Sequence, residues 1–436
     1  MKKLVLIIAI ITAAFWSQAQ KVWTLDECVD YAMEHNVTIL QSILSQNNAQ
    51  YQYKMAKNAW LPTISADASQ SFGFGQSPSA NGVYVSDNSS STSLGISVGM
   101  PLFNGLNLYN QTKSSALALE ASKKDLEAAK FDLKLLIMSY YMQVVYNKEL
   151  KAIAEKQLAL TEEQYNKTLQ LFELGKVAEA NVYESAAQVS TDKSSLVQAN
   201  NNLMLSVLDI IQALELETTD GFDVVSPEEF NTLETTTLPS QETTYAFALK
   251  HQPKMEAANM RLEKTYYDVK ASKSAWYPSL SFYAGYSNGY YNYFTSGYQN
   301  PSFSDQMSTN GRTSLGVRLN IPIFNAMQTK YNVEISKLSI QNQELAITTT
   351  QKDLKKEIQQ AFYNALASEQ KYKAAEETYR SAEIAYRYSK ESYESGKSTL
   401  LELNESKNRL FKSESEMLQA KYEYLYRVKV LNYYNQ

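Results

Sequence analysis

Few side chains in this sequence have the types and spacing that catalysis requires. The chain contains two histidines, His35 and His251, and one cysteine, Cys28, and none of them lies in a motif that joins a nucleophile to a base. Two histidines without neighbouring cysteines also argue against a structural zinc site. Gly73-Phe74-Gly75 falls in a predicted strand, which is the wrong setting for a phosphate-binding loop. We therefore expect no enzyme, no metal and no cofactor. The equivalent positions of the histidines in the two halves suggest a shared packing or capping role, and we expect both to lie on helix surfaces.

The net charge and the amino-terminal residues limit the classes to which the protein can belong. The chain has 41 Lys and Arg residues against 46 Asp and Glu residues and no basic block, so nucleic acid is not an expected partner. Lys2 and Lys3 precede the apolar run from Leu4 to Ala14, and Ala19 ends a small-residue cleavage site. We predict a signal peptide over residues 1–19. No later stretch has the roughly 20 apolar residues of a membrane-spanning helix.

The second half of the chain repeats the first. Ala59-Trp60-Leu61-Pro62 recurs 216 positions later as Ala275-Trp276-Tyr277-Pro278, and Pro101-Leu102-Phe103-Asn104 recurs 221 positions later as Pro322-Ile323-Phe324-Asn325. One five-residue insertion between Pro278 and Ser314 explains the change of offset. We predict two large copies of one unit rather than a solenoid: a first repeat over 20–220, a linker over 221–242 and a second repeat over 243–436.

Two long segments lack both proline and glycine. Leu106 to Phe172 has apolar residues at heptad spacing, and Met327 to Tyr393 is its counterpart in the second repeat. A continuous helix of this length would be about 100 Å long, so we expect coiled-coil packing. Each long helix should stop near Gly175 or Gly396 and be followed by a returning helix. The predicted elements are helical hairpins over about 106–216 and 327–434, preceded by shorter helices over Leu25 to Ala59 and Thr243 to Ala275.

Between the helices the apolar residues alternate with polar ones. They occupy every second position from Leu94 to Leu102 and again from Leu315 to Ile323. A single pattern of this kind is usually a soluble hairpin with one buried face. The duplication, the signal peptide and the long Ser-, Asn- and Tyr-rich connections favour membrane-spanning strands instead. We predict two strands in each repeat, at about 62–75 and 92–103 and at about 278–288 and 313–324.

The number of strands predicts an assembly. Four strands in one chain are fewer than the roughly eight that the smallest membrane barrels need. An open sheet edge is also not tolerated in hydrocarbon, because its backbone groups would lack hydrogen-bond partners. Several chains must therefore pool their strands.

These features together resemble a known family, the bacterial outer membrane efflux proteins or TolC family. The resemblance covers the mature chain from the opening Trp23-Thr24-Leu25-Asp26-Glu27-Cys28 onward, and it is carried mainly by two equivalent motifs and the two Pro-Leu/Ile-Phe-Asn strand ends. The two motifs are Gly175-Lys176-Val177-Ala178-Glu179-Ala180-Asn181-Val182 and Gly396-Lys397-Ser398-Thr399-Leu400-Leu401-Glu402-Leu403.

The resemblance implies a fold and a function. The fold class is mainly α with a β-barrel part: a homotrimer shares one 12-stranded barrel in the outer membrane, and a periplasmic α-helical tunnel continues it. The implied function is the passive exit duct of a tripartite efflux or type I secretion system in a Gram-negative bacterium. The implied partners are a periplasmic adaptor protein, an inner-membrane transporter of the RND or ABC class, and outer-membrane lipid.

The resemblance also implies roles for individual residues. Glu402 and Glu405 take the positions of the periplasmic aperture gate, and a spacing of three places both on one helix face. Threefold symmetry would stack them into carboxylate rings that attract cations, whereas the alternative is an ordinary solvated helix face. Tyr393 and Asn181 take the positions of a latch between hairpins. The hairpin turns and the adaptor contacts fall on Gly175, Lys176, Val177, Gly396, Lys397 and Ser398.

Two tryptophans and four prolines mark the joints between helices and strands. Trp60 and Trp276 precede the strand-entry prolines, where amphipathic rings mark a membrane boundary or pack the joint. The strand-end prolines are Pro62, Pro101, Pro278 and Pro322.

Two other classes of function stay open from the sequence. A surface-binding or adhesion protein would use the polar loop from Asn288 to Arg312 and would keep its function without the hairpin tips. A soluble periplasmic coiled-coil scaffold would be recovered without detergent.

Overall fold

The computed structural model describes residues 22–78, 82–86, 88–219, 221–226, 238–294 and 299–435. The predicted signal peptide lies outside these residues. The chain divides into two compact units, and each of them draws on both repeats. We call them the helical unit (Met1–Ser45, Lys123–Glu256 and Thr348–Gln436) and the strand unit (Gln46–Ser122 and Ala257–Ile347).

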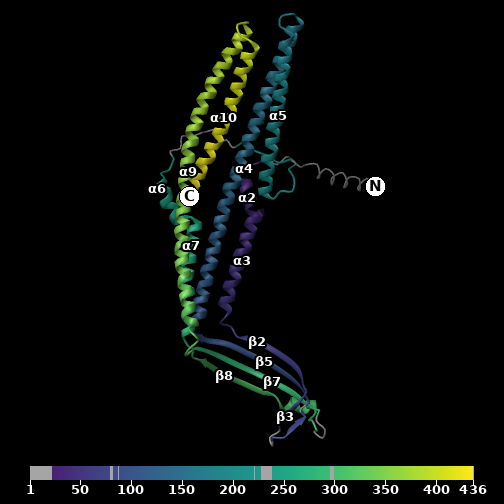
Figure 1. Ribbon diagram of the computed structural model, residues 1–436, viewed down its shortest axis with the longest axis vertical. Helices are drawn as coiled ribbons and strands as arrows, with labels where there is room; N and C mark the ends of the chain where they lie inside the picture. Colours follow the sequence, from purple (N-terminus) through teal and green to yellow (C-terminus); the bar gives the residue numbers. More distant parts are fainter. Residues whose placement is uncertain are drawn as a thin grey trace, which may run out of the picture. The chain divides into compact units, whose positions relative to one another are not determined.

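The two repeats contain matching helices (Figure 1). The long helices α4 and α9 have 67 residues each, and each is followed by a shorter returning helix. Their bounds in the first repeat are α2 Leu25–His35, α3 Val37–Asn58, α4 Asn107–Glu173 and α5 Glu179–Leu214; in the second they are α6 Gln241–His251, α7 Pro253–Lys273, α9 Gln328–Glu394 and α10 Leu400–Tyr433. Within the described ranges, none of these helices is long and apolar enough to cross a bilayer.

Each of the two shorter helices predicted at the start of a repeat is in fact a pair. The backbone turns extended at Asn36 (ψ 128°) and at Gln252 (ψ 126°), which separates α2 from α3 and α6 from α7. The Asn36 side chain stabilises its break, since its Nδ2 donates to the Ala213 carbonyl at 2.9 Å and its Oδ1 accepts from the Thr38 amide at 2.9 Å. At the second break Pro253 disfavours a helical conformation for the residue before it.

The two histidines occupy equivalent places at the ends of α2 and α6. His35 stacks on Tyr31 with ring centroids 3.9 Å apart, and His251 stacks on Phe247 at 4.3 Å. In both cases Nδ1 lies within hydrogen-bonding distance of the backbone carbonyl oxygen four residues earlier, at 2.9 and 3.0 Å. The predicted shared packing role is therefore confirmed.

The core of the helical unit lies around α4, where Tyr141 is fully buried. Its hydroxyl donates to the Val225 carbonyl at 2.5 Å and also lies 3.1 Å from the Trp23 carbonyl. Trp23 ends β1 (Val22–Trp23), and Val225 directly follows β6 (Asp223–Val224), which pairs with β1 in parallel. The predicted linker over 221–242 therefore begins with a strand. Burial raises the pKa of Tyr141, which keeps the hydroxyl protonated as a donor.

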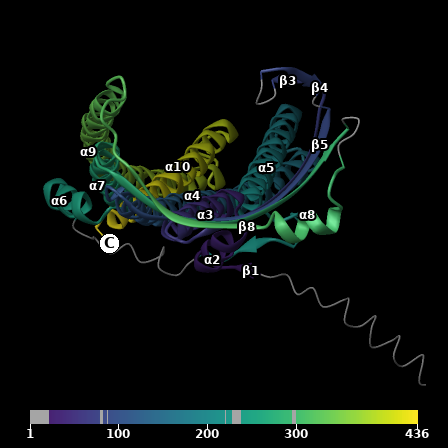
Figure 2. The ribbon, with the colours of Figure 1, turned by 90° about the horizontal axis from the view of Figure 1, so that it is seen from below.

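The strand unit contains one four-stranded antiparallel sheet in the order β2-β5-β7-β8 (Figure 1). Figure 2 shows β5 and β8 of this sheet together with β3, β4 and the short helix α8 of the same unit. A two-stranded ribbon, β3 with β4, extends from the β2–β5 connection, and the short helix α8 lies against β7 in the loop that carries the insertion. The bounds are β2 Thr63–Gly73, β3 Gln76–Pro78, β4 Tyr84–Ser86, β5 Ser89–Asn104, β7 Ser279–Tyr293, α8 Phe303–Thr309 and β8 Arg312–Asn320.

The register gives this sheet two unlike faces. Directly paired residues share a face, so Ile64 lies beside Val98, and Val98 lies beside Ala284. This face is apolar across all four strands and is uncovered, with Ile96 52% exposed and Val317 61% exposed. The opposite face carries Ser, Gly and charged residues, among them Ser65, Asp67, Ser97, Gly99, Ser281, Arg312, Arg318 and Asn320.

The last strand is shorter than predicted. The expected strand at 313–324 ends at Asn320, opposite Ser279, because β7 begins directly after Pro278 and offers no further partner. Pro322 also lacks the amide hydrogen that a continued ladder would need. In the first repeat β5 continues to Asn104 because it also pairs with β7, across a bulge between Pro101 and Phe103.

Candidate functional site

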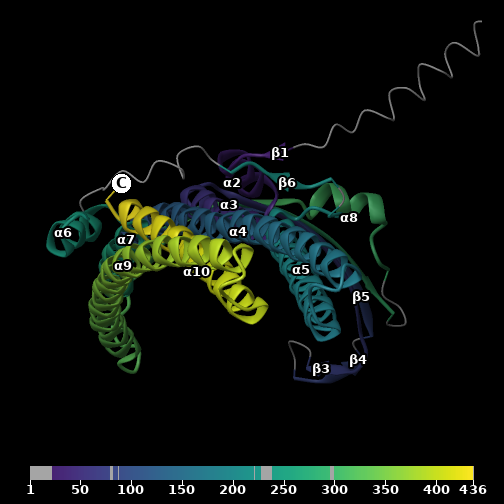
Figure 3. The same cartoon turned by 90° about the horizontal axis from the view of Figure 1, so that it is seen from above.

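The tips of the two helical hairpins are built alike. Gly175 (φ 68°) and Gly396 (φ 73°) adopt the left-handed conformation that ends α4 and α9. The next amide closes the turn in both, from Lys176 to the Leu171 carbonyl at 2.9 Å and from Lys397 to the Ser392 carbonyl at 2.8 Å. This is the usual way in which glycine terminates a helix. Seen from above, α5 returns beside α4 and α10 beside α9 (Figure 3).

The residues expected to dock a partner lie at these turns. Lys176 and Lys397 are exposed, whereas Val177 and Ser398 are half-buried. The Ser398 hydroxyl oxygen is buried without a hydrogen-bond partner among the described residues. Such a group is costly unless something satisfies it.

Glu402 has a structural role that the sequence analysis missed. Its carboxylate accepts from the Thr399 amide at 2.9 Å, and its own amide donates to the Thr399 hydroxyl at 3.2 Å. These two bonds form a capping box at the start of α10. The Thr-x-x-Glu pattern was readable from the sequence. In the first hairpin Ala178 takes the place of Thr399, and α5 begins without a side-chain cap.

Glu405 differs from Glu402. It is exposed on α10 and, in the part of the chain that the structure describes, has neither a hydrogen bond nor an ion pair. Their spacing of three places Glu402 and Glu405 on one face of α10. The Glu402 carboxylate caps the helix, whereas the Glu405 carboxylate does not.

The structure does not join the two expected latch residues within one chain. The Tyr393 hydroxyl, on α9, accepts from Gln164 of α4 at 3.4 Å. Asn181, near the start of α5, uses its backbone carbonyl to accept from the Ser185 hydroxyl at 2.9 Å. The neighbouring ion pair between Lys167 and Glu394, at 3.6 Å, also connects α4 with α9.

A buried polar network lies two residues beyond Glu405. Lys407 of α10 is 4% exposed, and its ammonium donates to the Thr161 hydroxyl of α4 at 2.6 Å. Thr161 in turn donates to the Asp192 carboxylate of α5 at 2.5 Å. The same carboxylate accepts from Gln157 and Gln188, both at 2.9 Å. The network thus ties three helices and both hairpins together.

Burial lowers the pKa of Lys407, and the negative charge of Asp192 opposes that shift. The direction follows from desolvation, which disfavours the charged ammonium. No sequence pattern pointed to this network, because its members are distant in the chain.

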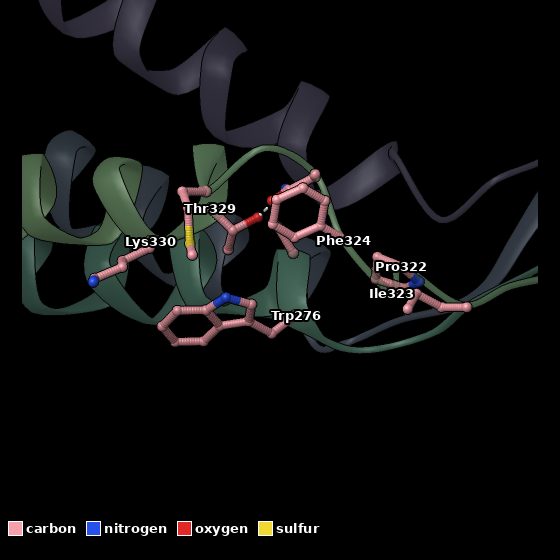
Figure 4. A pocket seen from close by; sticks show the side chains of 9 residues that line it. Trp276, Pro322, Ile323, Phe324, Thr329 and Lys330 are labelled. Carbon is pink, nitrogen blue, oxygen red and sulfur yellow. Dashed lines mark hydrogen bonds between the residues drawn. The ribbon is translucent and has the colours of Figure 1, made fainter.

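The predicted boundary tryptophans and strand-end prolines lie where the strands meet the helices. Trp60 and Trp276 are both exposed, 37% and 52%. Trp276, Pro322 and Phe324 line a small cavity of about 170 Å³, and Figure 4 shows the Trp276 ring beside Thr329 with Lys330 on one side and Phe324 on the other. Pro62 and Pro278 stand directly before β2 and β7, and Pro101 lies at the bulge of β5.

Comparison with known proteins places the chain in a family. A protein from Brucella suis biovar 1, outer membrane efflux protein BepC, is 22% identical over 309 residues, which is 71% of this chain and 62% of that protein. Outer membrane protein TolC of Vibrio cholerae is 23% identical over 199 residues, 45% of each chain. The chain thus aligns with less than two thirds of the length of either relative.

The fold comparison extends over nearly the whole chain. The crystal structure of the Campylobacter jejuni CmeC outer membrane channel superposes with a TM-score of 0.77 at 19% identity, covering 94% of this chain and 85% of that one. The family described as outer membrane efflux protein matches residues 28–215 and 245–432, one match to each repeat. This chain belongs to the outer membrane efflux protein family.

Proposed function

We propose that this chain is the outer-membrane exit duct of a tripartite efflux or type I secretion system. Three copies share one 12-stranded barrel, and their helical hairpins form a periplasmic tunnel. Substrates pass through without chemistry, driven by an inner-membrane transporter of the RND or ABC class through a periplasmic adaptor. The family consists of channel proteins rather than enzymes, and this supports the proposal.

One observation carries the proposal: the strand unit has an uncovered apolar face and two edge strands. β2 and β8 lie at the ends of the strand order, so among the described residues each has one edge without a pairing strand. A sheet with one apolar and one polar face fits hydrocarbon on one side and an aqueous lumen on the other. Pairing β8 of each copy with β2 of the next would close three such sheets and leave no edge in the membrane.

The oligomeric mass of detergent-extracted protein tests this assembly. We expect a trimer, measured by light scattering corrected for bound detergent, and we expect it only in the outer-membrane fraction. A monomer recovered from the soluble periplasm would refute the barrel, the tunnel and the export function together, and would favour the scaffold.

We further propose that Glu405, with Glu402, forms the aperture ring. Conductance in planar bilayers can separate this role from helix capping, because glutamine retains a capping box whereas it loses the charge. Glu405→Gln and Glu402→Gln should each reduce cation selectivity. Thr399→Ala, which removes the cap and keeps the charge, should leave selectivity unchanged. Glu416→Gln, an exposed site on the same helix, is the matched control. Unchanged selectivity in both gate variants would remove the gate.

The adaptor should dock at the hairpin tips. Lys176→Glu and Lys397→Glu reverse the exposed charge at each tip without touching the glycine turns. We expect these variants to assemble as trimers and to lose export in cells. An adhesion protein, in contrast, would keep its surface function after both changes. Lys352→Glu, on the exposed surface of α9, provides the charge-reversal control.

A further inference from the structure

A second cavity of about 440 Å³ lies within the strand unit, at the joint between β5 and α4. Its lining combines the apolar side chains of Phe103 and Leu106 with Tyr277, and it includes two lysines from the last turn of α7, Lys270 and Lys273. Cavities that bind small ligands combine an apolar lining with a few converging polar groups in this manner.

The residues that line this cavity include two lysines and no acidic side chain. Lys264, six residues before Lys270 on α7, is paired with Asp268 at 2.7 Å. Neither Lys270 nor Lys273 forms an ion pair within the described residues, and both are exposed. Lys270 instead lies over the Tyr267 ring, 4.6 Å from its centroid. Lysines in a last turn also complement the helix dipole, but that role does not require a cavity beside them.

The lysine pair recurs in the other repeat. Lys54 and Lys57 precede Lys270 and Lys273 by the same 216 positions that separate the two tryptophans. The local geometry recurs as well, because Lys54 lies over the Tyr51 ring at 5.1 Å, as Lys270 does over Tyr267. Both repeats thus place two exposed ammonium groups just before a strand.

One residue that lines the cavity, Phe103, belongs to the apolar face of the sheet. Beyond the bulge in β5, Phe103 pairs directly with Leu280, and the face of Leu280 is the one that holds Phe282 and Val98. The two lysines therefore lie where the apolar face of the sheet ends. If the sheet spans a membrane, which rests on the proposed function, this is the depth of the lipid headgroups.

We propose that this cavity binds the phosphate headgroup of an anionic phospholipid. Lys270 and Lys273 pair with the phosphate as point charges, while Phe103 and Leu106 contact the first carbons of the acyl chains. Tyr277 sits at the boundary, where an aromatic ring with a polar tip is favoured. The equivalent pair, Lys54 and Lys57, would form the same contact where β2 meets the next copy.

Native mass spectrometry of the full detergent-solubilised chain tests the proposal. The protein is titrated separately with phosphatidylglycerol, phosphatidylcholine and inorganic phosphate. We expect phosphatidylglycerol to bind most tightly. Lys270→Gln with Lys273→Gln should weaken that binding by about fivefold for each lysine, or roughly 25-fold together. The control, Lys352→Gln with Lys356→Gln, removes two exposed charges from α9 and should change nothing.

The outcomes are distinct. Equal loss in both double variants, or none in either, overturns the site. Inorganic phosphate binding as tightly as phosphatidylglycerol overturns its assignment to lipid. Bilayer conductance of the same samples separates this inference from the proposed function. If the Lys270→Gln, Lys273→Gln variant conducts and binds lipid as tightly as the wild type, the proposed headgroup site is refuted and the proposed export duct is not. If the wild-type protein is soluble without detergent and does not conduct, the proposed export duct is refuted.

Discussion

Removing the charge of Asp192 should destabilise the helical unit more than removing its partner Lys407. In Asp192→Asn the amide keeps the space and its oxygen can still accept from Gln157 and Gln188, but the ammonium of Lys407 loses the carboxylate to which Thr161 links it. Breaking a buried pair by removing one partner costs about 3–5 kcal/mol. We expect the lower end, about 3 kcal/mol, because the two hydrogen bonds from Gln157 and Gln188 survive.

The reciprocal change should cost less. In Lys407→Met the Asp192 carboxylate keeps three donors, from Thr161, Gln157 and Gln188, so we expect a loss of about 1–2 kcal/mol. The double variant removes both charges and should be no worse than Lys407→Met alone, because replacing a buried pair by neutral groups is often close to neutral. The expected coupling between the two sites is therefore about 3 kcal/mol in favour of the pair.

Denaturant unfolding of the four proteins measures this coupling. Protein concentration must be held fixed, because assembly contributes to apparent stability. Additive losses, with the double variant as unstable as the sum of the two single variants, would refute the reasoning. A pH series gives a second check. Since the folded pKa of Lys407 lies below its unfolded value, wild-type stability should gain from this group as pH rises through the range between the two.

Three other substitutions test separate parts of the helical unit. Burial raises the pKa of Glu414; Lys156 opposes this shift and Glu383 reinforces it. The stability that Glu414 contributes is therefore present below its unfolded pKa and is lost as the pH rises through its folded pKa. Glu414→Gln should raise the melting temperature near neutral pH but not below about pH 4, whereas the control Glu416→Gln should leave the melting temperature unchanged at both. Gly396→Ala forces a Cβ into a left-handed conformation and should cost about 1 kcal/mol in thermal unfolding, with a smaller loss for Gly396→Asn. Tyr141→Phe removes the hydroxyl that donates to the Val225 carbonyl, whereas the Trp23 carbonyl keeps the Val225 amide as a donor, and the change should cost about 1–3 kcal/mol by denaturant titration. A loss no larger than that of an exposed Tyr→Phe change, such as Tyr388→Phe, would contradict the anchoring role.

The parts of the fold that follow local rules were predictable from the sequence. Proline- and glycine-free segments became α4 and α9, and the glycines at 175 and 396 ended them. The break at Gln252 was also readable, since Pro253 follows it, and we overlooked that signal. The break at Asn36 was not, because it depends on a hydrogen bond to Ala213, 177 residues away.

The candidate site divides in the same way. The capping role of Glu402 follows from the Thr-x-x-Glu pattern and was predictable from the sequence. The Lys407 network could not be read from sequence, since Thr161 and Lys407 are 246 residues apart and a lysine on a helix is ordinarily solvated. The aperture gate, the latch and the adaptor contacts stay predictions.

The equal length of α4 and α9 constrains how this protein can change during evolution. A helix turns by about 100° for each residue, so one residue inserted near the start of either helix would rotate every later side chain away from its neighbours. The position of Gly396, at the same 221-residue offset from Gly175 as Phe324 from Phe103, shows that neither helix has gained or lost a residue relative to the other since the duplication. The five extra residues instead lie in the connection before β8, which carries α8. The lengths of the two long helices are therefore constrained by the register of their side-chain contacts, and the difference in length between the repeats lies in a loop.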